Sequence, residues 1–273
     1  MKNSRFQVNH FNGENACRKV ILSLLIALLV LCGTQALADE QVNAGDALTF
    51  GHYPQTSDGT DNTPIEWLVL DVQDGKAFLL SRYALDAQPY NTTRPDVTWE
   101  TSSLRAWLNN EFLNAAFTAD EQNAILLTDV NNGDSKHYSQ WQGKGGNNTQ
   151  DKVYLLSYSE AHNYLKVSAS EKSGSQKNKT SRAAATAYAQ AQGVYTSGQV
   201  RQMDGYTSAP TKDRTEDGEE ACYWWLRSPG TIQINGARVN LNGSLGSEEL
   251  TKTDQGVRPV LWIDLSAWEQ LQN

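Results

Sequence analysis

Residues 65–82 read IEWLVLDVQDGKAFLLSR, and this stretch decides the class of fold. Its first eight residues alternate between two faces, which is the period of a β-strand. The dipeptide Asp74–Gly75 that follows is typical of a tight turn, and residues 76–82 are again mainly apolar. The stretch therefore predicts a β-hairpin in which residues 65–72 pair with residues 76–82.

Further strands are predicted on both sides of this hairpin. Residues 47–51 (ALTFG) precede it, and residues 153–157 (VYLLS) lie near the middle of the chain. Three more candidate strands follow closer to the C-terminus. They cover residues 223–227, 237–241 and 257–265.

Helical patterns lie between these strands. The strongest begins at Thr101 or Ser102 and repeats apolar residues at steps of three and four up to Ala115. Shorter helices are predicted over residues 119–125, from near Ser159, and over residues 181–192. Because helices and strands mix without regular βαβ alternation, the predicted class is α+β, with a mainly antiparallel sheet, flanking helices and long polar loops.

Three polar stretches are long enough to carry function. They cover residues 131–151, 166–180 and 196–220, and their composition adds little to a core. Loops of this length are uncommon unless they are functional or disordered. We therefore expect ligand contacts in these loops.

The first 38 residues have the parts of a secretory signal. A basic region precedes the apolar stretch 20–31, and Ala36–Leu37–Ala38 is a typical cleavage motif. The apolar stretch is shorter than the roughly 20 residues that a membrane-spanning helix needs. We expect residues 1–38 to be cleaved as a signal peptide, leaving residues 39–273 as a single secreted or cell-envelope domain without a membrane span. An uncleaved anchor is the alternative.

Charge and cysteine content restrict the partners of the mature domain. Without residues 1–38 it has 19 basic and 30 acidic residues, a balance that repels nucleic acid. Cys222 is the one cysteine left, so no disulfide can form within the domain. Nucleic acid is therefore not an expected partner, and the fold has to rely on a packed core.

Several ordered motifs resemble one family over nearly the whole mature chain. The sequence is similar to a bacterial domain-of-unknown-function family, the one numbered six-two-seven-three. This resemblance implies a fold distantly similar to the C-type-lectin-like fold, which includes the formylglycine-generating enzymes. In those proteins a late W-x-R strand pairs with a G-x-R-P-like strand. The motifs are FGHYPQT (50–56), PIEWLVLD (64–71), WETSSLRAWLNNEF (99–112), VYLLSYSEA (153–161), WWLRSPG (224–230), A-x-V-N-x-x-G (237–243) and GVRPVLWIDL (256–265).

Two departures limit what the resemblance implies about activity. Calcium-dependent sugar-binding lectins use E-P-N or Q-P-D followed by W-N-D, and none of these strings is present. Formylglycine-generating enzymes use a pair of cysteines, whereas the mature chain has Cys222 alone. Neither activity is carried over to this sequence.

Arg227 and Trp225 are the first candidate ligand-binding residues. They share one face of the predicted strand 223–227, opposite Trp224 and Leu226, which are assigned to the core. An arginine beside an aromatic ring is suited to bind a carboxylate or sugar hydroxyls. The alternative is a half-buried arginine that holds loop carbonyls. Arg258 is assigned the same structural role.

Trp141 and Tyr138 are the second pair of candidates. They lie in YSQWQGKGGNN, where most other residues are Gly, Asn and Gln. An exposed aromatic ring there would stack on a sugar or a partner side chain, and nearby amides would supply hydrogen bonds. Alternatively, the loop folds back and buries Trp141 against the domain.

The sequence predicts no metal, cofactor or catalytic residue. The mature histidines lack metal-ligand spacing, and the acidic loop residues do not form an EF-hand pattern. No G-x-S-x-G motif occurs either.

These observations predict an exported, non-enzymatic binding domain. Its loops would recognise an extracellular ligand: a glycan, a peptide or a protein surface. A structural or interaction module of the cell envelope is the first alternative, and an enzyme with an unfamiliar site is the second. Convergence of Trp141, Tyr138, Trp225 and Arg227 in one open concavity would favour binding, whereas a scatter of buried positions would favour the structural module.

Overall fold

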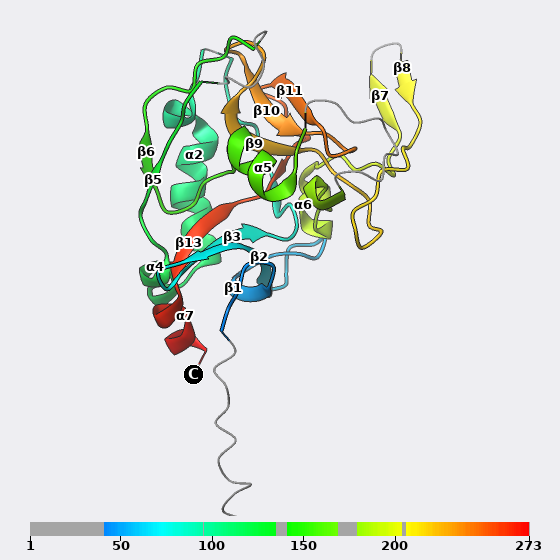
Figure 1. Ribbon diagram of the computed structural model, residues 1–273. Coiled ribbons are helices and arrows are strands. Elements are labelled where there is room, and N and C mark those ends of the chain that lie inside the picture. The colour runs from blue at the N-terminus through cyan, green and yellow to red at the C-terminus, as the bar shows by residue number, and fades with distance from the viewer. Residues whose placement is uncertain (1–40, 95, 135–140, 169–178, 204–205, 273) are drawn as a thin grey trace, which may run out of the picture. The chain divides into compact units, whose positions relative to one another are not determined.

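A four-stranded antiparallel sheet contains the predicted hairpin. The computed structural model describes residues 41–94, 96–134, 141–168, 179–203 and 206–272, of which those from Val42 onward belong to one compact unit. The sheet has the order β1 (Ala47–Tyr53), β2 (Thr63–Gln73), β3 (Lys76–Ser81) and β13 (Val260–Asp264) (Figure 1). The β2–β3 hairpin and the first strand are confirmed.

A second sheet is built mainly from the C-terminal part of the chain. All of its pairs are antiparallel except β9 with β12, which run parallel. The described residues also contain two short two-stranded hairpins. The predicted α+β class with mainly antiparallel sheets is therefore confirmed. The second sheet has the order β11 (Leu245–Glu249), β10 (Asn235–Val239), β9 (Trp224–Pro229), β12 (Gly256–Val257) and β4 (Asp86–Ala87), and the hairpins are β5 (Thr128–Val130) with β6 (Thr149–Asp151) and β7 (Arg201–Met203) with β8 (Tyr206–Ser208).

The segment 256–264 belongs to both sheets. The sequence predicts one strand over 257–265, but Arg258 and Pro259 separate β12 from β13. Proline has no N–H to donate to a ladder, although its carbonyl still accepts a bond from Ser81 N at 3.0 Å. The chain therefore leaves the second sheet at Arg258 and enters the first sheet at Val260.

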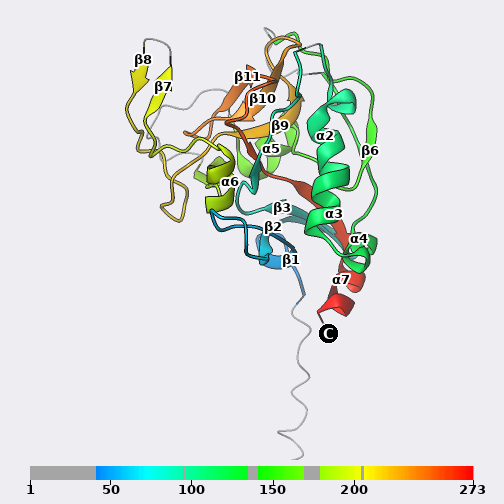
Figure 2. The same ribbon diagram turned by 180° about the vertical axis from the view of Figure 1, so that it is seen from behind.

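The predicted helix over 101–115 is present as a series of helical turns. It starts with η1 (Trp99–Thr101) and continues through α2 (Ser103–Trp107), the π-helical turn η2 (Leu108–Phe112) and α3 (Leu113–Ala116). Strand β6 lies beside this series (Figure 2). The remaining helices are α4 (Ala119–Ala124), α5 (Tyr158–Leu165), η3 (Lys179–Ser181), α6 (Ala187–Gln192) and α7 (Leu265–Leu271). Among the helices of the described residues, none has the length and apolar character needed to cross a membrane.

The predicted strand over 153–157 is wrong. Only an isolated bridge between Tyr154 and Val260 is present there. The Asn109 side chain, from the π-helical turn, accepts bonds from the backbone N–H groups of Lys152 and Val153 at 2.9 and 3.2 Å and donates to the Val153 carbonyl. Hydrogen bonds to the Asn109 side chain thus replace some of the backbone hydrogen bonds that this stretch would form as a strand in a sheet.

The predicted helix over 181–192 is correct only in its second half. Residues 182–186 are extended and buried, and α6 begins at Ala187. Ala84 N donates to the Ala184 carbonyl, and Cys222 N donates to the Ala183 carbonyl, at 2.9 and 2.8 Å. Tertiary pairing therefore outweighs the helix propensity of the alanines.

The core buries both faces of β9. Trp224 and Leu226 are fully buried, as expected, and so is Trp67, whereas Trp107 is only partly buried. Arg227, placed by the sequence on an open face, is also buried. The period-two pattern assumes that one face of the strand meets solvent, but α5 and the segment around Tyr90 cover the other side.

Candidate functional site

A cavity of about 290 Å³ lies where three parts of the chain meet. The stretch that follows β5 forms one wall, the start of α5 a second, and the end of β9 a third. Most of its lining residues have polar side chains, although apolar atoms also contribute to the surface. The lining residues are Asn131, Asn132, Gly133, Asp134, Ser157, Tyr158, Ser159, Glu160, Arg227, Ser228 and Pro229.

Arg227 forms the most deeply buried part of this wall. Its Nη1 donates to the Leu155 carbonyl at 2.7 Å and to Glu160. Its Nη2 donates to the Asn131 carbonyl at 3.1 Å and to Glu160 Oε1 at 3.2 Å. The guanidinium group also lies over the Tyr154 ring. The arginine thus ties α5 and the stretch after β5 to β9.

Glu160 neutralises the Arg227 charge at the edge of the cavity. Burial disfavours its ionised form, but the charge of Arg227 and hydrogen bonds from Arg227 and Ser157 outweigh that effect and lower its pKa. Glu160 is therefore ionised at neutral pH and accepts hydrogen bonds. A group held in this state is not suited to donate a proton as a general acid.

The start of α5 positions the hydroxyl groups. Ser157 is the N-cap, and Ser157 and Glu160 form a reciprocal capping box. The next backbone N–H, that of Tyr158, donates to Ser228 Oγ at 2.9 Å. These bonds fix Ser157 and Ser228 at the wall.

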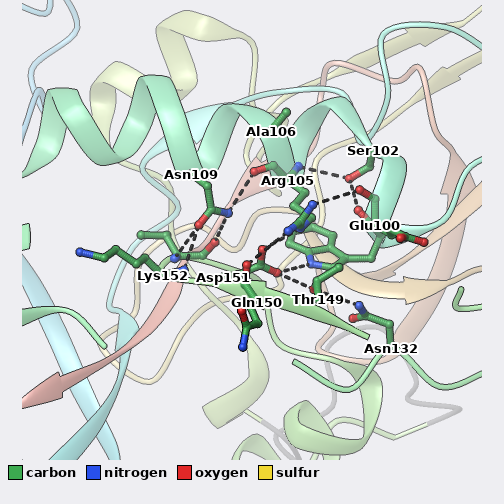
Figure 3. Close-up of polar contacts among 12 residues, drawn as sticks. Glu100, Ser102, Arg105, Ala106, Asn109, Asn132, Thr149, Gln150, Asp151 and Lys152 are labelled. Carbon is green, nitrogen blue, oxygen red and sulfur yellow. Dashed lines mark hydrogen bonds and ion pairs between the residues drawn. The ribbon is translucent and has the colours of Figure 1, made fainter. Parts of the chain in front are cut away.

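Asn132 is positioned by a buried network centred on Asp151 (Figure 3). Its Nδ2 donates to Thr149 Oγ1 at 3.1 Å, and that hydroxyl donates to Asp151 Oδ2 at 2.8 Å. The same carboxylate accepts bonds from Trp99 Nε1 at 2.9 Å and Arg105 Nε at 2.6 Å. The hairpin β5–β6 is thereby held against the helix that contains Arg105.

Two buried polar atoms of the wall have no hydrogen-bond partner within the described residues. They are Asn132 Oδ1, an acceptor, and Arg227 Nε, a donor. A buried polar group without a partner costs about 1–3 kcal/mol. Both residues line the same cavity, but these two atoms have almost no accessible surface, so a ligand held there would contact other atoms of Asn132 and Arg227.

The predicted binding residues do not all meet at this cavity. Arg227 lines it, whereas Trp225 is fully buried beside Tyr90, with its Nε1 donating to the Gln88 carbonyl at 2.9 Å. Trp141 is half-buried and packs against the hydrophobic core, which agrees with the alternative that the loop folds back onto the domain; its contact with a ligand stays a prediction. Tyr138 lies outside the described residues.

Close backbone packing explains part of the position of Trp141. Gln142 N donates to the Thr231 carbonyl at 3.0 Å, and Gly143 packs against Pro229 and Gly230. A Cβ atom at Gly145 would lie 1.7 Å from the Asn132 carbonyl oxygen. The glycines of this loop therefore permit a close approach to the cavity wall.

Sequence reasoning missed Glu160 and Asn132. The pattern Ser157-x-x-Glu160 is a capping-box signature and locates the start of α5. It does not reveal that Glu160 also meets Arg227. No signal in the sequence marks Asn132, because its position depends on contacts with Thr149.

No acidic, histidine or cysteine side chains gather in a group of three suited to a metal ion anywhere in the described ranges. The cavity contains both hydrogen-bond donors and acceptors, together with the Pro229 surface. Its geometry suits the binding of a small polar group.

The chain was compared with known protein families, curated proteins and solved structures. The family model described as "Domain of unknown function (DUF6273)" matches residues 74–265. No curated protein and no solved structure matches the chain.

Proposed function

The chain belongs to the DUF6273 family of domains, and from this premise we propose that it is an exported, non-enzymatic binding domain. The cavity between α5 and β9 would receive a sugar unit of an extracellular glycan. A peptide or protein surface is the alternative kind of ligand.

The observation that carries this proposal is the neutralised, hydroxyl-rich wall. Arg227 and Glu160 neutralise each other's charge, and both residues line the cavity. Ser157, Ser159 and Ser228 add hydroxyl groups that both donate and accept. Sugars carry many neutral hydroxyl groups, so this combination favours them over a multiply charged ligand.

The size of the cavity restricts the ligand further. At about 290 Å³ it is at the small end of ligand pockets, which span about 300–1,000 Å³. One sugar unit, or one peptide side chain, is of suitable size. A longer ligand would extend over the surface beside it, where Asn131 and Asp134 are exposed.

We also propose a C-type-lectin-like fold and export through residues 1–38. The pairing of β9 with β12 supports this fold, because a W-x-R strand pairs with a G-x-R-P-like strand there. In this chain Trp225 and Arg227 of the first motif lie on β9, and the second motif, Gly256 to Pro259, contains β12. The basic region, the apolar stretch and Ala36–Leu37–Ala38 support export.

Gly133 offers a way to test the cavity without disturbing its supports. It lines the cavity, and a Cβ atom there would have Asn131 Oδ1 as its nearest neighbour at 3.5 Å, an ordinary contact. Gly133→Trp should fill the cavity, whereas Gly133→Ala should leave most of it open. Both variants should melt close to the wild type.

The experiment is a screen of the purified protein on a glycan array and a peptide array, followed by affinity measurements on the strongest hit. We expect glycan binding that Gly133→Trp abolishes and Gly133→Ala retains. Peptide binding that Gly133→Trp abolishes and Gly133→Ala retains would show that the ligand of this cavity is a peptide and not a sugar. Binding unchanged by Gly133→Trp, or an absence of binding on both arrays, would overturn this site and favour a structural module of the cell envelope.

A further inference from the structure

A second cavity of about 290 Å³ shares no residue with the first. It lies beside the end of β3, the segment 179–184 and the turn 215–219. Its wall combines buried cations with acidic residues. The charged residues are Arg82, Lys179, Arg182, Arg258, Glu216, Asp217 and Glu219.

Arg258 is a buried cation that lacks an acidic partner in the described part of the chain. Its side chain is 2% exposed, and its Nε donates to the Ser81 carbonyl at 2.8 Å. Its guanidinium carbon lies 5.1 Å from the centre of the Trp224 ring. Within the described residues its Nη1 has no hydrogen-bond partner, and almost none of the surface of this atom is accessible. A buried charge without a counter-charge is strongly unfavourable, so an anionic group in the cavity would stabilise it.

Arg258 keeps its charge under physiological conditions. Burial lowers its pKa to about 10, which is still far above neutral pH. The need for a counter-charge thus persists, since the guanidinium group does not lose its proton.

The other two arginines of the wall already have acidic partners, and Arg182 Nη2 lies 3.9 Å from Asp213 Oδ1. Arg82 pairs with Glu66 at 3.3 Å and with Asp217 at 2.8 Å. Glu216 and Glu219 are exposed and line the same cavity. The acidic groups therefore lie at the solvent side, and Arg258, the one of the three arginines without an acidic partner among the described residues, lies inside.

We propose that this second cavity binds a zwitterionic small molecule, of which a free α-amino acid is the simplest. Its carboxylate would pair with Arg258, and its ammonium group would lie near Glu216 and Glu219. A doubly charged anion would be repelled by those two carboxylates. A simple cation would leave Arg258 without a partner. The volume suits a molecule of this size.

The experiment measures thermal unfolding of the full protein with the twenty standard amino acids, each added singly. Three ions serve as comparisons: acetate and inorganic phosphate carry only negative charge, and methylammonium carries only positive charge. At a concentration about 100-fold above its Kd, a binding amino acid should raise Tm by about 5–11 °C. The three comparison ions should raise it far less.

Substitutions of the exposed residues Glu216 and Glu219, which form the rim of the cavity, keep the test independent of folding. Glu216→Gln with Glu219→Gln should weaken amino-acid binding about tenfold and leave the melting temperature of the free protein unchanged. Glu111→Gln, an exposed change away from the cavity, is the matched control and should change neither. Arg258→Gln should abolish the shift if the variant folds.

Three results would overturn the proposal. The first is that no amino acid raises the melting temperature. The second is that phosphate or acetate binds as tightly as the best amino acid, which would point to a plain anion site. The third is that binding survives unchanged in the double rim variant.

Discussion

Arg227 and Glu160 form a two-point ion pair in which Nη1 donates to Oε2 and Nη2 donates to Oε1 at 3.2 Å. Ser157 N donates to the same Oε2 at 2.7 Å. One carboxylate therefore caps α5 and also joins this helix to β9. Removing its charge should loosen both connections.

Glu160→Gln should destabilise the protein at neutral pH by about 2 kcal/mol, because a bond between charged groups becomes a weaker neutral one. The pKa of Glu160 is lowered by folding, so its stabilising contribution is complete above the ordinary value of about 4.3. It is lost as pH falls through the lower folded pKa. Chemical denaturation from about pH 7 to about pH 3 should show a smaller loss of stability in the variant than in the wild type. Glu121→Gln, in a capping box without an arginine, is the control and should have a smaller effect.

Asp151→Ala should cost about 3 kcal/mol or more, because it removes a buried acceptor shared by Trp99, Arg105 and Thr149. Denaturant unfolding measures this change. Asp129→Ala, at an exposed carboxylate on the same hairpin, should change stability by less than about 0.5 kcal/mol. Equal effects at both positions would show that the Asp151 network is not a main support of the hairpin.

Gly145→Ala should lower the melting temperature and disturb the first cavity. Its Cβ atom would lie 1.7 Å from the Asn132 carbonyl oxygen, so the backbone of one strand of the loop has to move. Gly133→Ala, which meets no such obstacle, is the matched control. A Gly145→Ala variant as stable as the wild type would contradict this close approach.

Trp141→Ala should lower stability by about 1–3 kcal/mol, since this half-buried ring packs against the core. Trp141→Phe should retain much of that stability. The hypothesis that Trp141 also contacts a ligand is tested with Trp141→Phe and Trp141→Ala on the glycan found by the array. Affinity that falls in parallel with ring size, at a temperature where both variants are folded, would support it. Normal affinity in Trp141→Ala would assign Trp141 to loop anchoring alone.

Export predicts cleavage after Ala38, because the Ala36–Leu37–Ala38 motif follows the apolar stretch. N-terminal sequencing of the protein recovered outside the cytoplasm of an expressing bacterium should begin at Asp39. Ala38→Arg should block this cleavage, and Asp39→Glu should leave it unchanged. Recovery of a protein that retains residues 20–31 would contradict the prediction.

Local patterns predict the elements that are stabilised by their own sequence. The β2–β3 hairpin follows from alternation and an Asp74–Gly75 turn, where both residues have positive φ angles of 49° and 73°. The start of α5 near Ser159 follows from local helix signals, and its N-cap is Ser157. In each case the chemistry lies within a few neighbouring residues.

Elements that depend on distant partners could not be predicted. Residues 182–186 are alanine-rich, but Ala84 and Cys222 pair with them and keep them extended. Residues 153–157 are apolar, but the Asn109 side chain takes up their backbone groups.

The cavity was predicted only in part for the same reason. Arg227 and the loop that begins at Asn131 were identified, whereas Glu160 becomes part of the site through a bond that spans 67 positions. Trp225 and Arg227 were assigned to a face that would meet a ligand, but both side chains are buried, and this burial is a tertiary effect.

The division of residues 256–264 between two sheets has a consequence for the timing of folding. Strand β13 completes the sheet that begins at Ala47, and β12 lies between β9 and β4 in the other. A ribosome must therefore synthesise almost all of the described domain before either sheet can close. Contacts between residues so distant in sequence also form slowly. During synthesis the hairpin β2–β3 has an unpaired edge until β13 arrives, so a chaperone that shields this edge should increase the yield of folded protein.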